Sequence, residues 1–136
     1  IDSPAGIDGL PLKKLVSLSD KIIVPLKPSI FDIMSTQVFL SELVELINYE
    51  EKEIDLCVIG NMVEEGSKPT EQLKKFIKNI GLESPTFIRN STVYVSLAAH
   101  GVTLFDSSKN QFRREKTSWQ PLINWLEDKG NYAVQN

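Results

Sequence analysis

The residues best suited to chemistry lie at the start of the chain, in the run IDSPAG at residues 1–6. The pattern predicts that Asp2 ends a buried strand and that Gly6 lies in the turn that follows. In phosphate-binding ATPases, a carboxylate at such a position supports the Mg²⁺ shell, and a glycine lets its backbone N–H approach the terminal phosphate. An ordinary transition from strand to turn, without a ligand, is the alternative interpretation.

Asn61 is a second candidate, because it follows Gly60 after the apolar strand predicted over residues 54–59. Nucleotides bind at the carboxyl ends of the strands of parallel sheets, and an asparagine amide can pair with a purine edge. The position therefore suits a contact with a nucleotide base. A plain turn residue is the alternative.

Several basic residues near the end of the chain suit contacts with phosphates. They are Arg89, Lys109, Arg113, Arg114 and Lys116. Nonspecific DNA binding needs such charges within reach of one face rather than a sequence motif. Glu115 interrupts the run, so a solvated connection is the alternative. A net charge of −3 argues against a dedicated, strongly basic nucleic-acid binder, but it allows a local basic patch.

The remaining polar residues give weaker cases for chemistry. His100 is the only histidine, and a helix-terminal position explains it better than a metal cluster or a Ser-His-Asp triad. Cys57 is the only cysteine and lies inside an apolar run, so we expect a buried side chain rather than a nucleophile or ligand. Asp8, Glu64 and Glu65 are interpreted as solvated loop charges.

Short β-branched runs alternate with longer stretches of helical period, which is typical of βαβ units. We therefore expect an α/β fold with a mostly parallel sheet flanked by helices. Strands are predicted over residues 21–25, 54–59 and 86–88, and helices over 10–17, 29–48, 69–80, 92–99 and from 118 until Gly130. The apolar stripe over 29–48 is so broad that we expect this helix to pack on more than one side.

Length and composition indicate one globular domain over residues 1–130, followed by a polar tail over residues 131–136. The 136 residues are 41% apolar, which is enough for a core of their own. No apolar run reaches the length of a bilayer span, and no signal-peptide pattern is present. These features predict a cytoplasmic protein.

IDSPAG is very similar to the Walker B and switch motif of the ParA/MinD family of deviant P-loop ATPases. Three later runs resemble successive segments of that family in the same order, namely DKIIVPLKPSIFDI (20–33), CVIGN (57–61) and FIRNSTVYVSLAAHGVTLFD (87–106). The resemblance covers most of residues 1–106, and its one sharp motif is the first. It implies that residues 1–130 are the C-terminal part of a single P-loop NTPase-like domain.

The resemblance also assigns roles to individual residues. Asp2 would orient Mg²⁺ through water, Gly6 would sense the γ-phosphate, and Asn61 would contact adenine. The chain contains no G-x-x-x-x-G-K-[ST] pattern, and such a loop supplies most of the charge stabilisation in phosphoryl transfer. We therefore expect the N-terminal phosphate-loop portion to be missing. ATP and Mg²⁺ would serve the intact protein, and neither would bind to this chain alone.

The intact protein implied by the resemblance dimerises on ATP, binds nonspecific DNA, and hydrolyses ATP when a ParB-like or cargo-adaptor protein stimulates it. Its role would be the partition of plasmids, chromosomes or other cargo on the nucleoid. Arg89, Arg113, Arg114 and Lys116 would contact DNA.

In this family the Walker B strand lies beside the strand that leads into the phosphate loop, and the strands over 21–24 and 54–59 continue that sheet. Without the loop strand an edge would stay unpaired, so self-association is expected. Residues 128–136 lack the length and the basic-apolar division of the membrane-binding helix of MinD-like relatives, so no membrane partner is expected. A non-catalytic α/β interaction module that keeps the fold is the alternative function.

Overall fold

The computed structural model describes residues 1–107 and 110–128 and has an α/β fold. The elements along the chain are α1 (Gly9–Ser17), β1 (Lys21–Leu26), α2 (Ile30–Asn48), β2 (Asp55–Val63), α3 (Lys68–Ile80), β3 (Phe87–Arg89), α4 (Thr92–Ala99), a 3-10 turn (Asn110–Phe112) and α5 (Arg113–Glu127). The predicted polar tail and Lys109 lie outside the described residues. Within them, no helix combines the length and apolar character needed to cross a membrane.

The three strands form one parallel sheet in the order β1-β2-β3, as the alternation of strand and helix patterns predicts. β2 lies at the centre, and its Cys57 and Val58 are fully buried. A central parallel strand covered on both faces has a continuous apolar run rather than an alternating one. The prediction of a strand covered on both faces over residues 54–59 is therefore confirmed in type, although β2 extends further.

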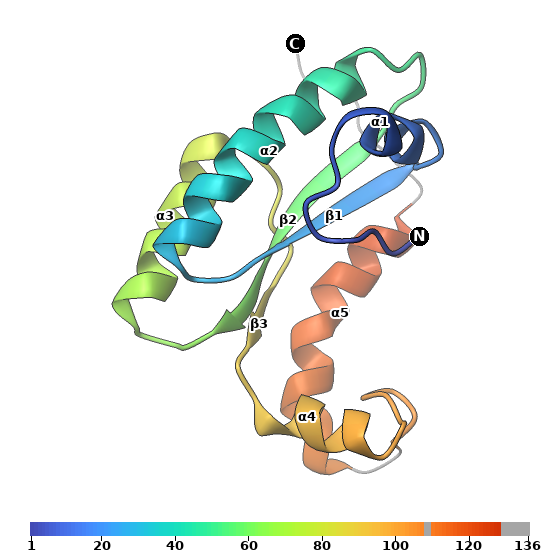
Figure 1. Cartoon of the computed structure of the whole chain (residues 1–136). Coiled ribbons are helices and arrows are strands. Elements are labelled where there is room, and N and C mark those ends of the chain that lie inside the picture. The colour runs from blue at the N-terminus through green and yellow to red at the C-terminus, as the bar shows by residue number, and fades with distance from the viewer. Residues whose placement is uncertain (108–109, 129–136) are drawn as a thin grey trace.

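The helices cover both faces of the sheet (Figure 1). One core joins the sheet to α1, α2 and α3 and is centred on Val58, Leu43 and Leu73. A second core, on the opposite face, joins Cys57 and Ile59 of β2 to α5. Its members from α5 are Leu122 and Trp125, with Trp119 partly buried beside them.

Lys21 fastens the end of α5 to the start of β1. Its ammonium group donates to the carbonyl oxygens of Trp125 and Asp128 at 2.7 and 2.9 Å, and it lies 3.2 Å from a carboxylate oxygen of Asp55. A cation at a helix C-terminus is favoured by the helix dipole. The same ammonium group lies 4.7 Å from the centre of the Trp125 ring, which adds a cation–π contact.

Local signals explain where α3 begins and ends. The Ser67 hydroxyl accepts from the N–H of Thr70, Pro69 lies in the first turn, and Gly81 ends the helix in the left-handed conformation at φ +69°. The prediction of a helix over 69–80 is thus confirmed, with the start one residue earlier. α2 likewise begins at a serine cap, Ser29.

Three predicted boundaries are wrong. β1 continues through Pro25 to Leu26, β2 continues past residue 59 to Val63, and α5 begins at Arg113 rather than near Ser118. Arginine, glutamate and lysine favour helices, so the charged run over 113–116 extends α5 instead of forming a connection. α2 also differs from the prediction. Within the described residues only one side of it packs on the core, through Ile33, Leu40 and Leu43.

Gly60 is a point of close contact between β2 and β3. A Cβ atom at this position would lie 2.3 Å from Cδ1 of the Phe87 ring. We expect Gly60→Ala to lower the free energy of unfolding by about 1–3 kcal/mol, because overpacking of this size forces side chains or backbone to shift. Urea unfolding followed by tryptophan fluorescence measures the change.

The matched control for this prediction is the same substitution in a Phe87→Ala background. Removal of the ring removes the steric clash, so Gly60→Ala should lower the free energy of unfolding much less in this background. Equal costs in the two backgrounds would show that the ring is not what excludes a side chain at Gly60.

Candidate functional site

The carboxyl ends of the three parallel strands lie at one edge of the sheet, the edge at which α/β proteins bind ligands. β2 and β3 reach this edge at Val63 and Arg89. The first turn of α5 lies beside the end of β3, because Arg89 contacts Glu115. Two of the predicted candidates, Asn61 and Arg89, are therefore neighbours at this edge.

Asp2 does not end a strand, so that part of the sequence prediction is wrong. Residues 1–4 are irregular, and Ile1 is 91% exposed. A strand needs a neighbour to pair its peptide groups, and none of the described strands pairs with these residues. The predicted turn is present at Ala5 and Gly6. Gly6 has φ +69°, a conformation that glycine adopts without strain, and no atom lies within 4 Å of where its Cβ would be.

The N-terminal segment lies beside the outer edge of β1. A cavity of about 190 Å³ separates the two and is lined by Ile1, Ser3 and Ile7 on one side and by residues 21–25 of β1 on the other. β1 pairs only with β2, so its far side has no strand partner among the described residues. The segment that carries Asp2 and Gly6 thus borders an open sheet edge.

Asn61 lies within β2 rather than in a turn after it, so the predicted end of this strand is wrong here. It pairs in register with Ile88, and a bulge follows at Met62, whose φ is +56°. A non-glycine residue with positive φ is uncommon, and bulges of this kind re-aim neighbouring side chains. Asn61 is half-buried and lines a cavity of about 160 Å³ together with Arg89, Tyr94 and Trp119. This cavity is separate from the one beside the segment that carries Asp2.

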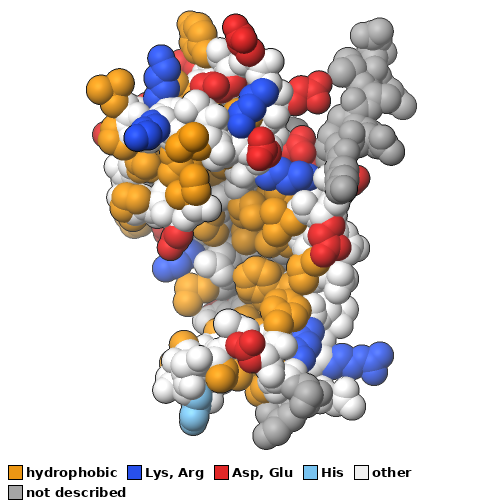
Figure 2. All heavy atoms as spheres, turned by 90° about the vertical axis from the view of Figure 1, so that its right-hand side faces the viewer, with side chains coloured by type: hydrophobic (Ala, Val, Ile, Leu, Met, Phe, Trp, Pro, Cys, Tyr) orange, Lys and Arg blue, Asp and Glu red, His pale blue; other side chains and the backbone are white. Residues whose placement is uncertain are grey.

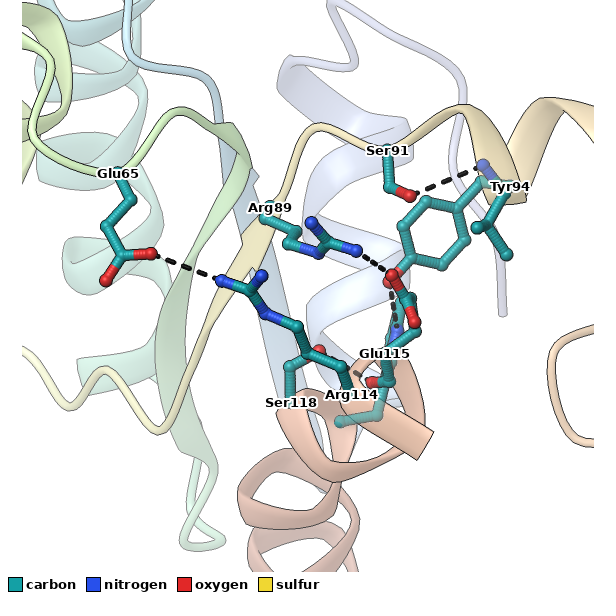
Figure 3. A network of polar contacts seen from close by, with 9 residues as sticks. Glu65, Arg89, Ser91, Tyr94, Arg114, Glu115 and Ser118 are labelled. Atoms are coloured by element: carbon teal, nitrogen blue, oxygen red, sulfur yellow. Dashed lines mark hydrogen bonds and ion pairs between the residues drawn. The ribbon is translucent and has the colours of Figure 1, made fainter. Parts of the chain in front are cut away.

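An ion pair between Arg89 and Glu115 joins β3 to α5 (Figure 3). The Glu115 side chain is 3% exposed, whereas that of Arg89 is 37% exposed. The hydrogen bond from the guanidinium group holds the pKa of the Glu115 carboxyl below its usual value, against the opposing effect of burial. Nε of Arg89 is buried and has no hydrogen-bond partner. Glu115 is thus a structural carboxylate, and its interpretation as part of a solvated connection is wrong.

Further hydrogen bonds fix the surroundings of this pair. The Thr86 hydroxyl donates to the carbonyl of Ser118 at 2.5 Å, and Nε1 of Trp119 donates to the Tyr94 hydroxyl at 3.1 Å. The Ser118 hydroxyl in turn donates to the carbonyl of Glu115 at 2.7 Å (Figure 3). β3, α4 and α5 are therefore held together at the carboxyl edge of the sheet.

Of the four basic residues predicted to contact DNA, the structure brings two into one cavity. Arg89 and Arg114 line a cavity of about 350 Å³, and Lys74 of α3 is a third cation there. Arg114 lies 3.3 Å from Glu65, and both side chains are exposed. Exposed pairs of this kind are worth less than about 1 kcal/mol, so Arg114 remains available to other anions.

The other two basic candidates differ from each other. Arg113 is exposed in the first turn of α5, whereas Lys116 is half-buried and donates to the carbonyl of Ser107. The first turn of α5 has no side-chain cap, because Phe112 occupies the N-cap position. The 3-10 turn Asn110–Phe112 leads directly into this helix.

The weaker candidates lie largely as predicted. Cys57 is fully buried, and burial raises the pKa of its thiol to about 12, with a further contribution from the charge of Glu83. His100 ends α4, and its Nδ1 lies 2.7 Å from the carbonyl oxygen of Ser96. Glu65 is a loop charge, as predicted, but it pairs with Arg114. Within residues 1–107 and 110–128, no group of three His, Cys, Asp or Glu side chains is placed to hold a metal ion.

Comparison with known proteins adds no family assignment. No protein-family model matches the chain, and no curated protein matches it at a significant level. The case for a function therefore depends on the motif, the fold and the position of the candidate residues.

Proposed function

We propose that the chain is the C-terminal part of a ParA-type ATPase domain with a P-loop fold, which dimerises on ATP and takes part in the partition of DNA or other cargo. The observation that carries this proposal is the position of the IDSPAG segment beside the open edge of β1. In ParA-like folds, the Walker B strand lies beside the strand that leads into the phosphate loop. A strand added at this edge would have Asp2 and Gly6 next to it.

The backbone of β1 supports a further strand at this edge. The carbonyl of Asp20 accepts from the N–H of Asp55 at 3.0 Å, and successive peptide groups of a strand point to alternate sides. The peptide groups of Lys21 and Ile23 therefore face the open edge. Pro25 also faces it, and its missing N–H leaves no donor unpaired there. Open edges of this kind recruit another strand, which is the basis for the proposed self-association of the chain when the phosphate-loop strand is absent.

The described residues fit only part of a Mg·ATP site. The Asp2 carboxylate is exposed, as support of a metal shell through water requires, and Gly6 is exposed with no atom within 4 Å of where its Cβ would be. The Asn61 amide lines the separate cavity at the carboxyl edge, where the purine would lie. The main phosphate contacts would come from a phosphate-binding loop, whose pattern is absent from this chain. Bound Mg²⁺ would supply charge neutralisation for phosphoryl transfer.

Nonspecific DNA binding is proposed for the start of α5. Arg113 and Arg114 are exposed in the first turn of α5, and exposed guanidinium groups suit contacts with backbone phosphates. In Figure 2, Lys and Arg side chains lie at the lower end of the molecule, where α4 and the first turn of α5 lie in Figure 1, as well as at its upper end. Arg89 is less available for a contact with DNA, because its guanidinium group is paired with Glu115.

We expect Arg113→Ala/Arg114→Ala to weaken binding of nonspecific duplex DNA by the ATP-bound dimer roughly tenfold at low salt. The slope of log affinity against log salt concentration should fall by roughly two, because two phosphate contacts are lost. Fluorescence anisotropy with a labelled duplex measures both quantities. Lys13→Ala/Lys14→Ala is the matched control, because it removes two exposed charges from α1 at the other end of the molecule. An equal loss in this control would place the DNA site elsewhere.

The ATPase part of the proposal has its own direct test. Mg²⁺-dependent ATP hydrolysis by the protein that joins this chain to a phosphate-binding loop separates an ATPase from a non-catalytic interaction module, which would bind partners but leave ATP intact.

A further inference from the structure

The outer face of α2 carries an unusual group of exposed apolar side chains. Ile30, Phe31, Met34 and Val38 are 55%, 78%, 61% and 74% exposed, and together they are called the α2 outer face. Ile30, Met34 and Val38 recur every four residues and so lie above one another on the helix, with Phe31 beside them. This stripe is opposite the side of α2 that packs on the core. The four side chains therefore do not serve the fold of the described chain.

The α2 outer face is compact enough to be a docking surface. From Ile30 to Val38 the helix rises about 12 Å, which is a little over two turns. Beyond Val38 the same side of the helix becomes polar at Ser41 and Glu45. An apolar patch bounded by polar residues is typical of a protein interaction site rather than of scattered surface residues.

The charges on α2 indicate what kind of partner fits. The helix carries Asp32, Glu42 and Glu45, all exposed, and it has no lysine or arginine. Lys27, in the loop before α2, is the nearest basic residue preceding the helix in sequence. In a parallel pair with a second copy of α2, Glu42 and Glu45 would lie near their equivalents, and like charges across an interface are unfavourable. A partner with basic residues beside its apolar stripe gives the complementary arrangement.

The geometry of the face also limits the partner's secondary structure. The backbone N–H and C=O groups of α2 form hydrogen bonds within the helix, so they are not available to pair with an extended strand. A partner helix satisfies its own peptide groups and packs its side chains between those of α2. We propose that the α2 outer face docks an amphipathic helix of another protein, with an apolar stripe flanked by Lys and Arg. This inference does not depend on the proposed ATPase activity.

The test uses the 136-residue chain and a labelled amphipathic helical peptide made of leucine and lysine. A peptide of the same pattern with glutamate in place of lysine is the charge control. We expect the Leu/Lys peptide to bind and the Leu/Glu peptide to bind at least tenfold more weakly. Phe31→Ser/Val38→Ser should weaken binding of the Leu/Lys peptide at least tenfold. Glu42→Gln/Glu45→Gln should also weaken binding of this peptide and make the affinity less dependent on salt concentration.

Val95→Ser is the matched control, since Val95 is 71% exposed on α4. It should leave peptide binding unchanged, and circular dichroism should show that every variant remains folded. An equal loss in Val95→Ser, or equal binding of the Leu/Glu peptide, would overturn the proposal. Sedimentation provides the last check. A dimer that dissociates in Phe31→Ser/Val38→Ser would show that a second copy covers this face and would also overturn the proposal.

Discussion

Asp2→Ala should lower the rate of ATP hydrolysis roughly 10- to 100-fold in the form of the protein that contains a phosphate-binding loop. The proposed role of Asp2 is to orient Mg²⁺ through a bound water, and loss of such an outer-shell carboxylate typically costs this much activity. Stability should change by no more than about 0.5 kcal/mol, because the Asp2 side chain is exposed and makes no contact that the fold requires. Steady-state hydrolysis and urea unfolding measure the two effects separately.

Asp8→Ala is the control for this prediction. Asp8 is an exposed carboxylate a few residues further along the same segment, and it precedes α1 without a side-chain capping bond. Its substitution should leave hydrolysis unchanged. An unchanged turnover number in Asp2→Ala would remove the Walker B assignment.

Arg89→Ala should lower the free energy of unfolding by about 2–3 kcal/mol near neutral pH. Removal of one partner from a buried ion pair costs about 3–5 kcal/mol, since the other charge stays buried and unpaired. The expected value here is smaller, because the Arg89 side chain is 37% exposed and water screens part of the interaction. Urea unfolding followed by the fluorescence of Trp119 and Trp125 measures this change.

The stability lost in Arg89→Ala should depend on pH. Arg89 lowers the pKa of Glu115 in the folded protein, so the pair stabilises the fold above the unfolded carboxyl pKa of about 4.3. That stability is lost as pH falls through the lower, folded pKa. Arg89→Ala removes the hydrogen bond that lowers this pKa most, so the variant has less of this stability to lose on acidification. The stability difference between wild type and variant should therefore shrink on acidification.

Two variants control for the loss of an arginine. Arg114→Ala removes a guanidinium group from an exposed pair with Glu65 and should cost less than about 1 kcal/mol. Arg89→Met/Glu115→Leu removes both charges and should recover much of the stability that Arg89→Ala loses. A double variant no more stable than Arg89→Ala would show that the unpaired carboxylate is not the cause.

Local signals were sufficient to predict most of the regular structure. Pro69 at the start and Gly81 at the end of α3 act within one turn of the helix that they bound. The apolar run over 54–59 indicates a strand covered on both faces, and β2 is that strand. Parallel pairing followed from the alternation of strands and helices, because parallel strands need a crossover between them.

The features that sequence reasoning missed depend on residues far apart in the chain. Glu115 pairs with Arg89 across 26 positions, and no local pattern distinguishes it from a solvated carboxylate. A strand at Asp2 depends on a neighbouring strand, and its sequence alone does not supply one. The left-handed conformation of Met62, which forms the bulge after Asn61, has no residue-type signal, since glycine or asparagine is the usual choice there. The breadth of the apolar stripe on α2 was visible, but its exposure was not.

The most direct test of the central claim is calorimetric titration of Mg·ATP into the 136-residue chain and into the protein extended by the coding region before Ile1. We expect that region to continue in frame and to encode a glycine-rich loop with a lysine. The extended protein should bind Mg·ATP at micromolar concentration, and the chain alone should show no binding there, because it lacks the backbone donors and lysine that grip phosphate. Tight, Mg²⁺-dependent binding by the chain alone, or an extension that neither encodes such a loop nor binds ATP, would contradict the ParA-type assignment.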